Sequence, residues 1–110
     1  MLEYYHYSIP VTEKREPEFY NDELQAWVYR PADNPYKLAF MRIDPDSKLP
    51  DCVKKYPHIC FKVDSVDKAI KGKEVTIPPF FHTNRKGVRE KIAYTLIEGA
   101  NVEFLEILKD

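Results

Sequence analysis

The chain has 110 residues, with 17 Lys and Arg against 18 Asp and Glu and a formal net charge of −1. This length accommodates one domain with one modest core, so two independently folding domains are excluded. The balanced charge offers no basic excess for phosphates, and no apolar run approaches the roughly 20 residues of a membrane span, so neither nucleic acid nor a membrane is an expected partner.

The chain is predicted to be mainly β-structure. Nine prolines against three glycines, with 14% aromatic residues, favour strands over a helical bundle. Period-two patterns predict strands over seven segments: Tyr4–Val11, Leu24–Arg30, Lys37–Ile43, His58–Val63, Glu74–Ile77, Val88–Ile97 and Val102–Leu108. A short strand is also expected near Glu18–Tyr20, and turns are expected at Pro31–Pro35 and Glu98–Asn101.

One helix is predicted, over Ser65–Ile70. Ser65 or the preceding Asp64 can cap its start, and Gly72 provides a left-handed stop. The proline- and aspartate-rich segment Asp44–Pro57 is expected to join two halves. We therefore predict one domain, 1–110, with a first module over about 1–46, a linker over 47–56 and a second module over about 57–110.

The two halves resemble one another. His6–Val11 and His58–Val63 both begin with His and end with Val, 52 positions apart, and Ala39–Ile43 matches Glu103–Ile107 at a spacing of 64. The difference, 12 residues, is about what a helix present only in the second half requires. An internal duplication is the resulting hypothesis.

Residues two apart on a strand share a face, so His58 and Cys60 lie opposite Ile59, Phe61 and Val63. The predicted helix would cover the apolar face and direct His58 into the concave side of the sheet, although alternation alone does not determine which of the two faces is concave. Cys60 is interpreted as a small buried hydrophobic residue.

Two histidines and a carboxylate on strands could bind a divalent metal. His6, His58 and Glu103 form such a set, suited to Zn, Ni, Fe or Mn, and we expect them to converge on one pocket. Taken singly, a strand histidine is more often a hydrogen-bonded structural residue, and a Glu near a C-terminus is usually solvated. Their equivalent placement in two similar halves favours the metal site.

At these residues the chain resembles the vicinal oxygen chelate superfamily, which includes glyoxalase, bleomycin-resistance proteins and extradiol dioxygenases. Pro57–Ile70 is similar to its strand-into-helix pattern, Ala93–Glu106 to its closing hairpin, and His6–Val11 to its opening strand. The resemblance implies an α+β fold in which two βαβββ modules curve a mixed sheet around a pocket. The first module is expected to lack most of its helix, because Glu16-Pro17-Glu18 interrupts it.

The resemblance implies that His6, His58 and Glu103 are the metal ligands. The fourth ligand position falls at or beside Ala39, which cannot bind a metal. Two alternatives remain open: a three-ligand site completed by water, or a pocket that has lost its metal.

Four further residues are candidates for substrate binding. Phe81 and His82 lie in a predicted mobile loop, Pro78–Gly87, while Arg42 and Arg89 offer positive charge to an anionic substrate. Solvated strand faces and an ordinary surface loop are the alternative interpretations.

We therefore predict a metal-dependent lyase or isomerase of the glyoxalase type, acting on a small oxygenated organic substrate through an enolate. Glu103 is its candidate catalytic residue, as ligand and base. The alternative is a metal-free, bleomycin-resistance-like binding protein. We also expect a homodimer, because exposed sheet edges invite pairing, and a cytoplasmic location, because the N-terminal segment lacks signal-peptide features.

Overall fold

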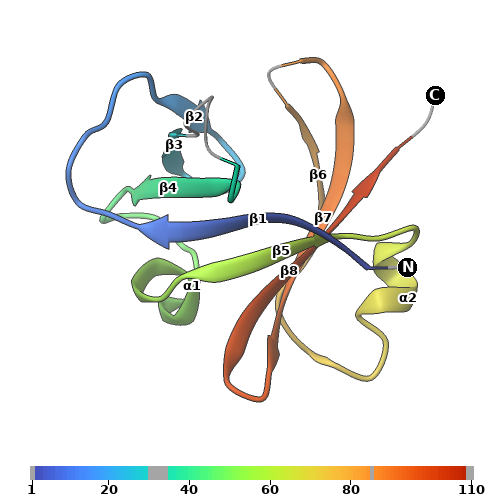
Figure 1. Ribbon diagram of the computed structural model, residues 1–110. Coiled ribbons are helices and arrows are strands. Elements are labelled where there is room, and N and C mark those ends of the chain that lie inside the picture. Colours follow the sequence, from blue (N-terminus) through green and yellow to red (C-terminus); the bar gives the residue numbers. More distant parts are fainter. Residues whose placement is uncertain (1, 30–34, 85, 109–110) are drawn as a thin grey trace.

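The computed structural model describes residues 2–29, 35–84 and 86–108 (Figure 1). Within these ranges the chain forms eight strands and two short helices. They are β1 (Glu3–Pro10), β2 (Phe19–Asn21), β3 (Ala26–Tyr29), β4 (Leu38–Ile43), α1 (Asp51–Lys55), β5 (His58–Lys62), α2 (Val66–Ala69), β6 (Glu74–Thr83), β7 (Arg89–Ile97) and β8 (Ala100–Ile107).

The strands form one curled sheet in the order β2-β3-β4-β1-β5-β8-β7-β6. Strand β1 pairs in parallel with β4, and β5 in parallel with β8, while the other neighbours are antiparallel. Each half thus contributes four strands in the same spatial order outward from the central β1–β5 pair. The predicted α+β fold, with two modules and a first module without its helix, is confirmed.

The strand register relates the two halves at the spacing that the sequence comparison predicted. Ser8 on β1 lies opposite Ala39 on β4. Cys60, which is 52 residues after Ser8, lies opposite Glu103, which is 64 residues after Ala39. The central pair agrees, because His6 lies opposite Cys60 and Ser8 lies opposite His58. Ala39 and Glu103 therefore occupy equivalent positions.

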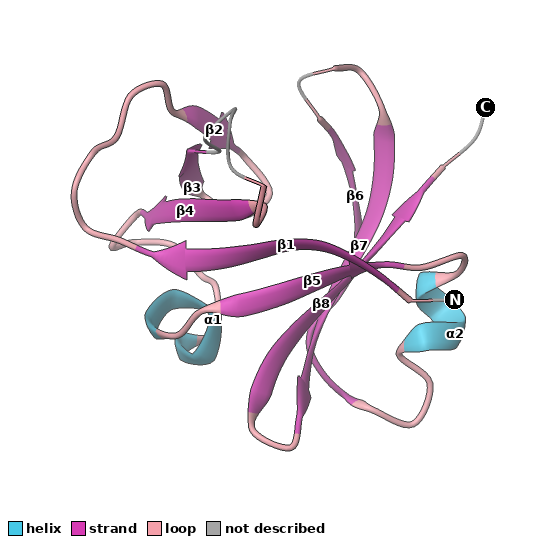
Figure 2. Cartoon of the chain, in the orientation of Figure 1, coloured by secondary structure: helices cyan, strands magenta, loops and turns pink. Residues whose placement is uncertain are grey.

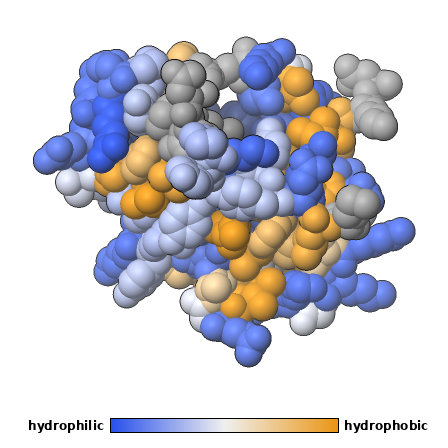
Figure 3. Space-filling model, in the orientation of Figure 1, coloured by the Kyte–Doolittle hydropathy of each residue, from blue (hydrophilic) through white to orange (hydrophobic). Residues whose placement is uncertain are grey.

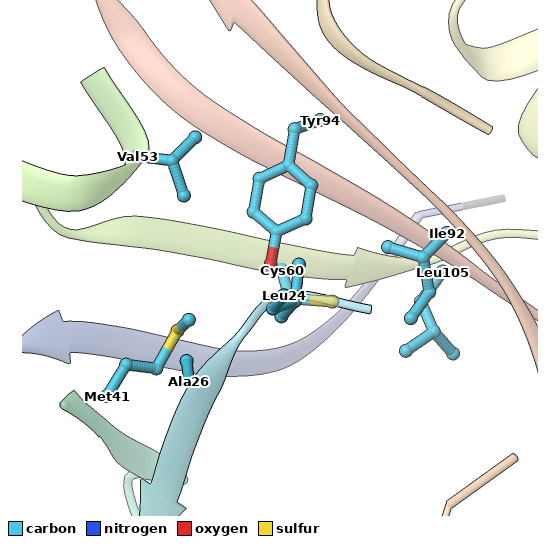
Figure 4. Close-up of a cluster of buried hydrophobic side chains, with 8 residues drawn as sticks. All are labelled: Leu24, Ala26, Met41, Val53, Cys60, Ile92, Tyr94 and Leu105. Atoms are coloured by element: carbon cyan, nitrogen blue, oxygen red, sulfur yellow. The ribbon is translucent and has the colours of Figure 1, made fainter. Parts of the chain in front are cut away.

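The two faces of the sheet carry separate apolar clusters. On the inner, concave face, residues from both halves pack together: Leu24, Ala26, Met41, Val53, Cys60, Ile92, Tyr94 and Leu105 (Figure 4). On the outer face, α2 packs on β5, β7 and β8 through a second cluster: Val63, Val66, Ala93, Val102 and Phe104. Alternation along β5 and β8 produces this division, because successive side chains point to opposite faces.

The helix α2 forms where the sequence predicts it. The Ser65 hydroxyl accepts a hydrogen bond from the Lys68 amide at 3.3 Å, and Gly72 has a φ of +76° just after the helix. The helix α1 was not predicted. It lies within the expected linker and comes directly before β5 (Figure 2).

The prediction of a loop over Pro78–Gly87 was largely wrong, because β6 continues to Thr83. Its two prolines, Pro78 and Pro79, are tolerated because β6 is at the edge of the sheet, where one side of the strand needs no ladder donors. The register shifts between Ile77 and Phe80, at these prolines. Most of the turn predicted at Pro31–Pro35 lies outside the described residues.

No helix in the described parts of the chain is long and apolar enough to cross a membrane. Figure 3 shows hydrophilic side chains spread over the visible surface, with apolar ones in several patches, one of them below the centre of the view.

Candidate metal centre

Three adjacent strands carry a row of potential metal ligands across the middle of the sheet. Cys60 on β5 lies opposite His6 on β1 and opposite Glu103 on β8. Directly opposed residues share a face, so these three side chains point to the inner side of the sheet. His58, two residues before Cys60, shares that face. The structure therefore brings His6, His58 and Glu103 together.

A single carboxylate oxygen lies at the centre of this group. Oε1 of Glu103 is 2.9 Å from Nε2 of His58 and 3.3 Å from Nε2 of His6. All three residues are buried, with exposed fractions of 3% for Glu103, 3% for His58 and 6% for His6. Despite these short distances, Oε1 has no hydrogen-bond partner of suitable geometry. An oxygen in this situation is suited to a cation placed between the three side chains.

The environment of Glu103 keeps it ionised. Burial by itself would raise the pKa of the carboxyl, but the contacts with His58 and His6 outweigh burial and lower it well below its usual range. The group therefore combines an anionic oxygen with two imidazole nitrogens. Together these are the ligand types that zinc and other divalent transition metals prefer.

Cys60 extends the set of possible ligands. Its sulfur, a ring nitrogen of His6 and a carboxylate oxygen of Glu103 all lie within 4.8 Å of one another. The residues at this point of the sheet could therefore bind a metal. Alternation places Cys60 on the face of His58, but Cys60 was predicted only as a core residue, because nothing in the sequence alone indicates its distance from His6.

Neighbouring side chains fix the orientation of the histidines. The ring of Tyr94 packs edge-on against His58 at 5.0 Å between centroids, and Tyr5 packs against His6 at 5.7 Å. The Asn101 amide donates to the carbonyl oxygens of Cys52 and Pro57, at 2.7 and 3.2 Å. These hydrogen bonds hold the start of β5, where His58 stands. Such supporting contacts commonly decide how well a metal site is formed.

His6, His58 and Glu103 line a cavity of about 380 Å³ on the concave side of the sheet. Ala39, only 1% exposed, lines it as well, from the position equivalent to Glu103. The remaining wall comes from β2 and β3 on one side and from β6 and β7 on the other. A more open depression of about 590 Å³, near the end of β1 and α1, contains none of the candidate ligands.

His82 is the predicted substrate-binding residue that lies on this cavity. Its Nδ1 contacts Oε1 of Glu23, which belongs to the turn between β2 and β3, so the contact links the two ends of the sheet. Thr83 and Asn84 line the same edge of the cavity, and Asn84 donates to the buried Glu90 at 3.2 Å. Glu90 was not predicted from the sequence, because its inward direction is visible only in the β7 register.

The other three predicted substrate-binding residues are not among the described residues that line the cavity. Arg42 points to the outer face, where it donates to both carboxylate oxygens of Glu18, at 2.7 and 3.1 Å. Phe81 is 54% exposed, and Arg89 lies over its ring at 5.6 Å. Phe81 and His82 are adjacent on β6 and therefore point to opposite faces, so only His82 reaches the cavity.

Comparison with known proteins supports the fold. No family model matches the sequence, and no curated protein matches it. Among solved structures, a hypothetical protein from Bacillus halodurans C-125 is similar with a TM-score of 0.69 and 15% identity, over 99% of this chain and 96% of that one. The methylmalonyl-CoA epimerase from Mycobacterium tuberculosis is similar with a TM-score of 0.62 and 14% identity, over 96% of this chain and 88% of that one. Likeness at such identities shows that the chain shares the fold of these proteins.

Proposed function

We propose that this chain belongs to the vicinal oxygen chelate superfamily and is a metal-dependent lyase or isomerase acting on a small oxygenated substrate. The observation that carries the proposal is the convergence of two imidazole nitrogens and one carboxylate oxygen at the wall of a cavity. The similarity in fold to a methylmalonyl-CoA epimerase, an isomerase by its name, agrees with this reaction class.

His6, His58 and Glu103 would hold the metal, through Nε2, Nε2 and Oε1. When bound, a divalent ion would supply Lewis-acid polarisation of a substrate carbonyl. The surrounding residues provide the rest: Tyr94 and Tyr5 orient the two rings, and the apolar wall limits access of water.

The lowered pKa of Glu103 favours a role as ligand over a role as base. A carboxylate that binds its proton weakly is a poor acceptor for a proton from carbon, because the ideal base has a pKa near the working pH. The proposed function therefore assigns Glu103 to the metal first.

Because Ala39 has no donor atom, the proposed site has two imidazoles and one carboxylate as its ligands. Sites with three protein ligands are typical of catalytic zinc, because substrate or water completes the shell. The same Ala39 also supports the second candidate function, a metal-free binding protein, since a carboxylate is missing where the resemblance implies one. The cavity alone would serve that function.

Calorimetric titration with oxalate, which offers two vicinal oxygens, tests the first function against the second. Acetate is the matched ligand with a single carboxylate. We expect zinc-loaded protein to bind oxalate at least about 10-fold more tightly than metal-free protein, with a much smaller difference for acetate. Equal affinity for oxalate with and without zinc would contradict the metal-dependent function and favour simple binding.

Isotope exchange tests the reaction itself. Zinc-loaded protein should promote incorporation of solvent deuterium next to the carbonyl in some member of a panel of small 2-oxo and 2-hydroxy acids, followed by NMR. His58→Ala is the control that removes one proposed ligand. Exchange that proceeds equally in the control would contradict the assigned site.

We also propose that the protein is a homodimer. The edge strands β2 and β6 are the ends of the sheet, and large apolar side chains such as Tyr36 and Phe81 are exposed. Light scattering at tens of micromolar should give twice the chain mass. A monomer mass that does not change with concentration would refute the proposal.

A further inference from the structure

The sulfur of Cys60 lies close to His6 and Glu103 but has no role in the function proposed above. Cys60 is 0% exposed and is the direct cross-strand neighbour of both His6 and Glu103. Its sulfur lies within 4.8 Å of a ligand atom of each. In addition, the buried Oε1 of Glu103 lies 2.9 Å from Nε2 of His58 and 3.3 Å from Nε2 of His6, so donor atoms of several residues gather at this point.

Cys60 also occupies a position at which the two halves of the sheet differ. The first half pairs Ser8 with Ala39, whereas the second half pairs Cys60 with Glu103. The donor that β4 lacks at Ala39 is thus matched by an additional donor atom on the central strand β5. A thiolate is a strong ligand for zinc, whereas a serine hydroxyl at the same position is a weak one.

We propose that Cys60 is a fourth protein ligand of the metal, binding as a thiolate together with His6, His58 and Glu103. This inference rests on the proposed metal-dependent function. Binding of the metal would displace the thiol proton, which leaves to solvent, because a coordinated thiol is deprotonated. The resulting site would prefer zinc, cobalt or cadmium to manganese, since a soft sulfur ligand favours the softer ions.

Four protein ligands remain compatible with substrate binding here. His6, His58 and Glu103 line the cavity, whereas Cys60 contributes no exposed surface and is not among the described residues that line it. The sulfur would therefore approach from beneath, on the sheet side. The cavity side of the ion would stay accessible, and zinc sites can expand to five ligands.

The competing interpretation is that Cys60 is only a core residue. It packs with Tyr94, Leu24 and Leu105 in the inner apolar cluster (Figure 4). A buried thiol commonly behaves as a small hydrophobic group. The two interpretations differ in whether sulfur contacts the metal, which a spectrum reports directly.

The experiment is titration of metal-free protein with Co²⁺, followed by near-ultraviolet and visible absorption. A thiolate ligand gives an intense charge-transfer band, which nitrogen and oxygen ligands do not give. The variants are Cys60→Ser and the matched control Cys52→Ser, which makes the same change in the partly buried Cys52 of α1. Circular dichroism establishes that each variant is folded, and Cys60→Ala provides a second test should serine disturb the core.

We expect one equivalent of Co²⁺ and the charge-transfer band in the original chain and in Cys52→Ser, and loss of the band in Cys60→Ser. Zinc affinity should fall at least about 10-fold in Cys60→Ser, while manganese affinity changes much less. Stoichiometric binding without the band, or a band that persists in Cys60→Ser and Cys60→Ala, would overturn the role of Cys60 and leave the proposed function standing. Failure of the original chain to bind Co²⁺, Zn²⁺, Fe²⁺ or Mn²⁺ would overturn both.

Discussion

The two halves of the sheet share their strand order but cover their outer faces differently. In the second half, α2 packs on β5, β7 and β8 through apolar side chains centred on Val66 and Phe104. In the first half, residues 11–18 between β1 and β2 form no helix. The guanidinium of Arg15 lies 4.2 Å from the ring centre of Phe40 instead, and Arg42 lies 5.6 Å from that of Trp27.

This difference shows that the inner face does not depend on one kind of outer covering. The central strands β1 and β5 pair with each other through equivalent positions. This register alone determines where His6 and His58 lie. The halves differ at two equivalent inner-face positions, because β4 has Ala39 where β8 has Glu103, and β1 has Ser8 where β5 has Cys60.

Removal of the donor that distinguishes the halves should have the largest effect. Glu103→Ala deletes the oxygen that approaches both histidines, so zinc affinity should fall at least about 100-fold in a calorimetric titration. The matched control is Glu106→Gln on the outer face of the same strand, where Glu106 accepts from the Val66 amide at 3.0 Å. If the two variants bound zinc equally well, Glu103 would not be a ligand.

The coverings of the two halves should differ in stability. Val66 is fully buried under α2, so Val66→Ala should lower the free energy of unfolding by about 3 kcal/mol. Arg15→Ala removes an exposed cation–π contact in the first half and should cost less than about 1 kcal/mol. Urea denaturation of both variants measures the contrast. Equal losses would show that the loop covers its face as strongly as the helix does.

Ala39→Glu should make the inner faces more alike. Without metal, a carboxylate at this buried position should destabilise the chain by about 2 kcal/mol, because burial disfavours its charged form. With zinc or nickel, the added anionic ligand should offset this loss and raise the melting temperature relative to the metal-free variant. A loss of stability that does not respond to either metal would favour the metal-free binding protein.

The smallest effect is expected for the ion pair that holds the loop of the first half. The hydrogen bond from Arg42 lowers the pKa of Glu18 in the folded chain and outweighs burial, which by itself would raise it. The ion pair therefore stabilises the folded chain at pH values above the ordinary Glu pKa of about 4.3. This stabilisation is lost as the pH falls through the lower pKa that Glu18 has in the folded chain. Glu18→Gln should make the unfolding free energy less dependent on pH in that acidic range. Parallel pH profiles for both proteins would contradict this assignment.

Local patterns in the sequence predicted the parts of the site that depend on alternation and repetition. The equivalence of His6 with His58, and of Ala39 with Glu103, came from two constant spacings that the register reproduces. The Ser65 cap was visible because a side-chain oxygen before an apolar helical pattern is a local signal.

Features that depend on distant partners could not be predicted. Arg42 resembled an anion-binding residue, but only the folded chain brings Glu18 beside it. The helix α1 is five residues long and follows Pro50 in a proline-rich stretch, where propensity is a weak signal. The length of β6 was underestimated because prolines end strands in general, and the position of β6 at the sheet edge emerges only from the topology.

Metal analysis of protein purified without chelator tests the central claim most directly. The original chain is compared with the double variant His6→Ala, His58→Ala, after both have been shown to be folded. We predict close to one equivalent of a divalent transition metal in the original chain and loss of that metal in the double variant, because the variant lacks both proposed imidazole ligands. Equal metal content in the two proteins, or an original chain that contains no metal and takes up none on titration, would contradict the claim.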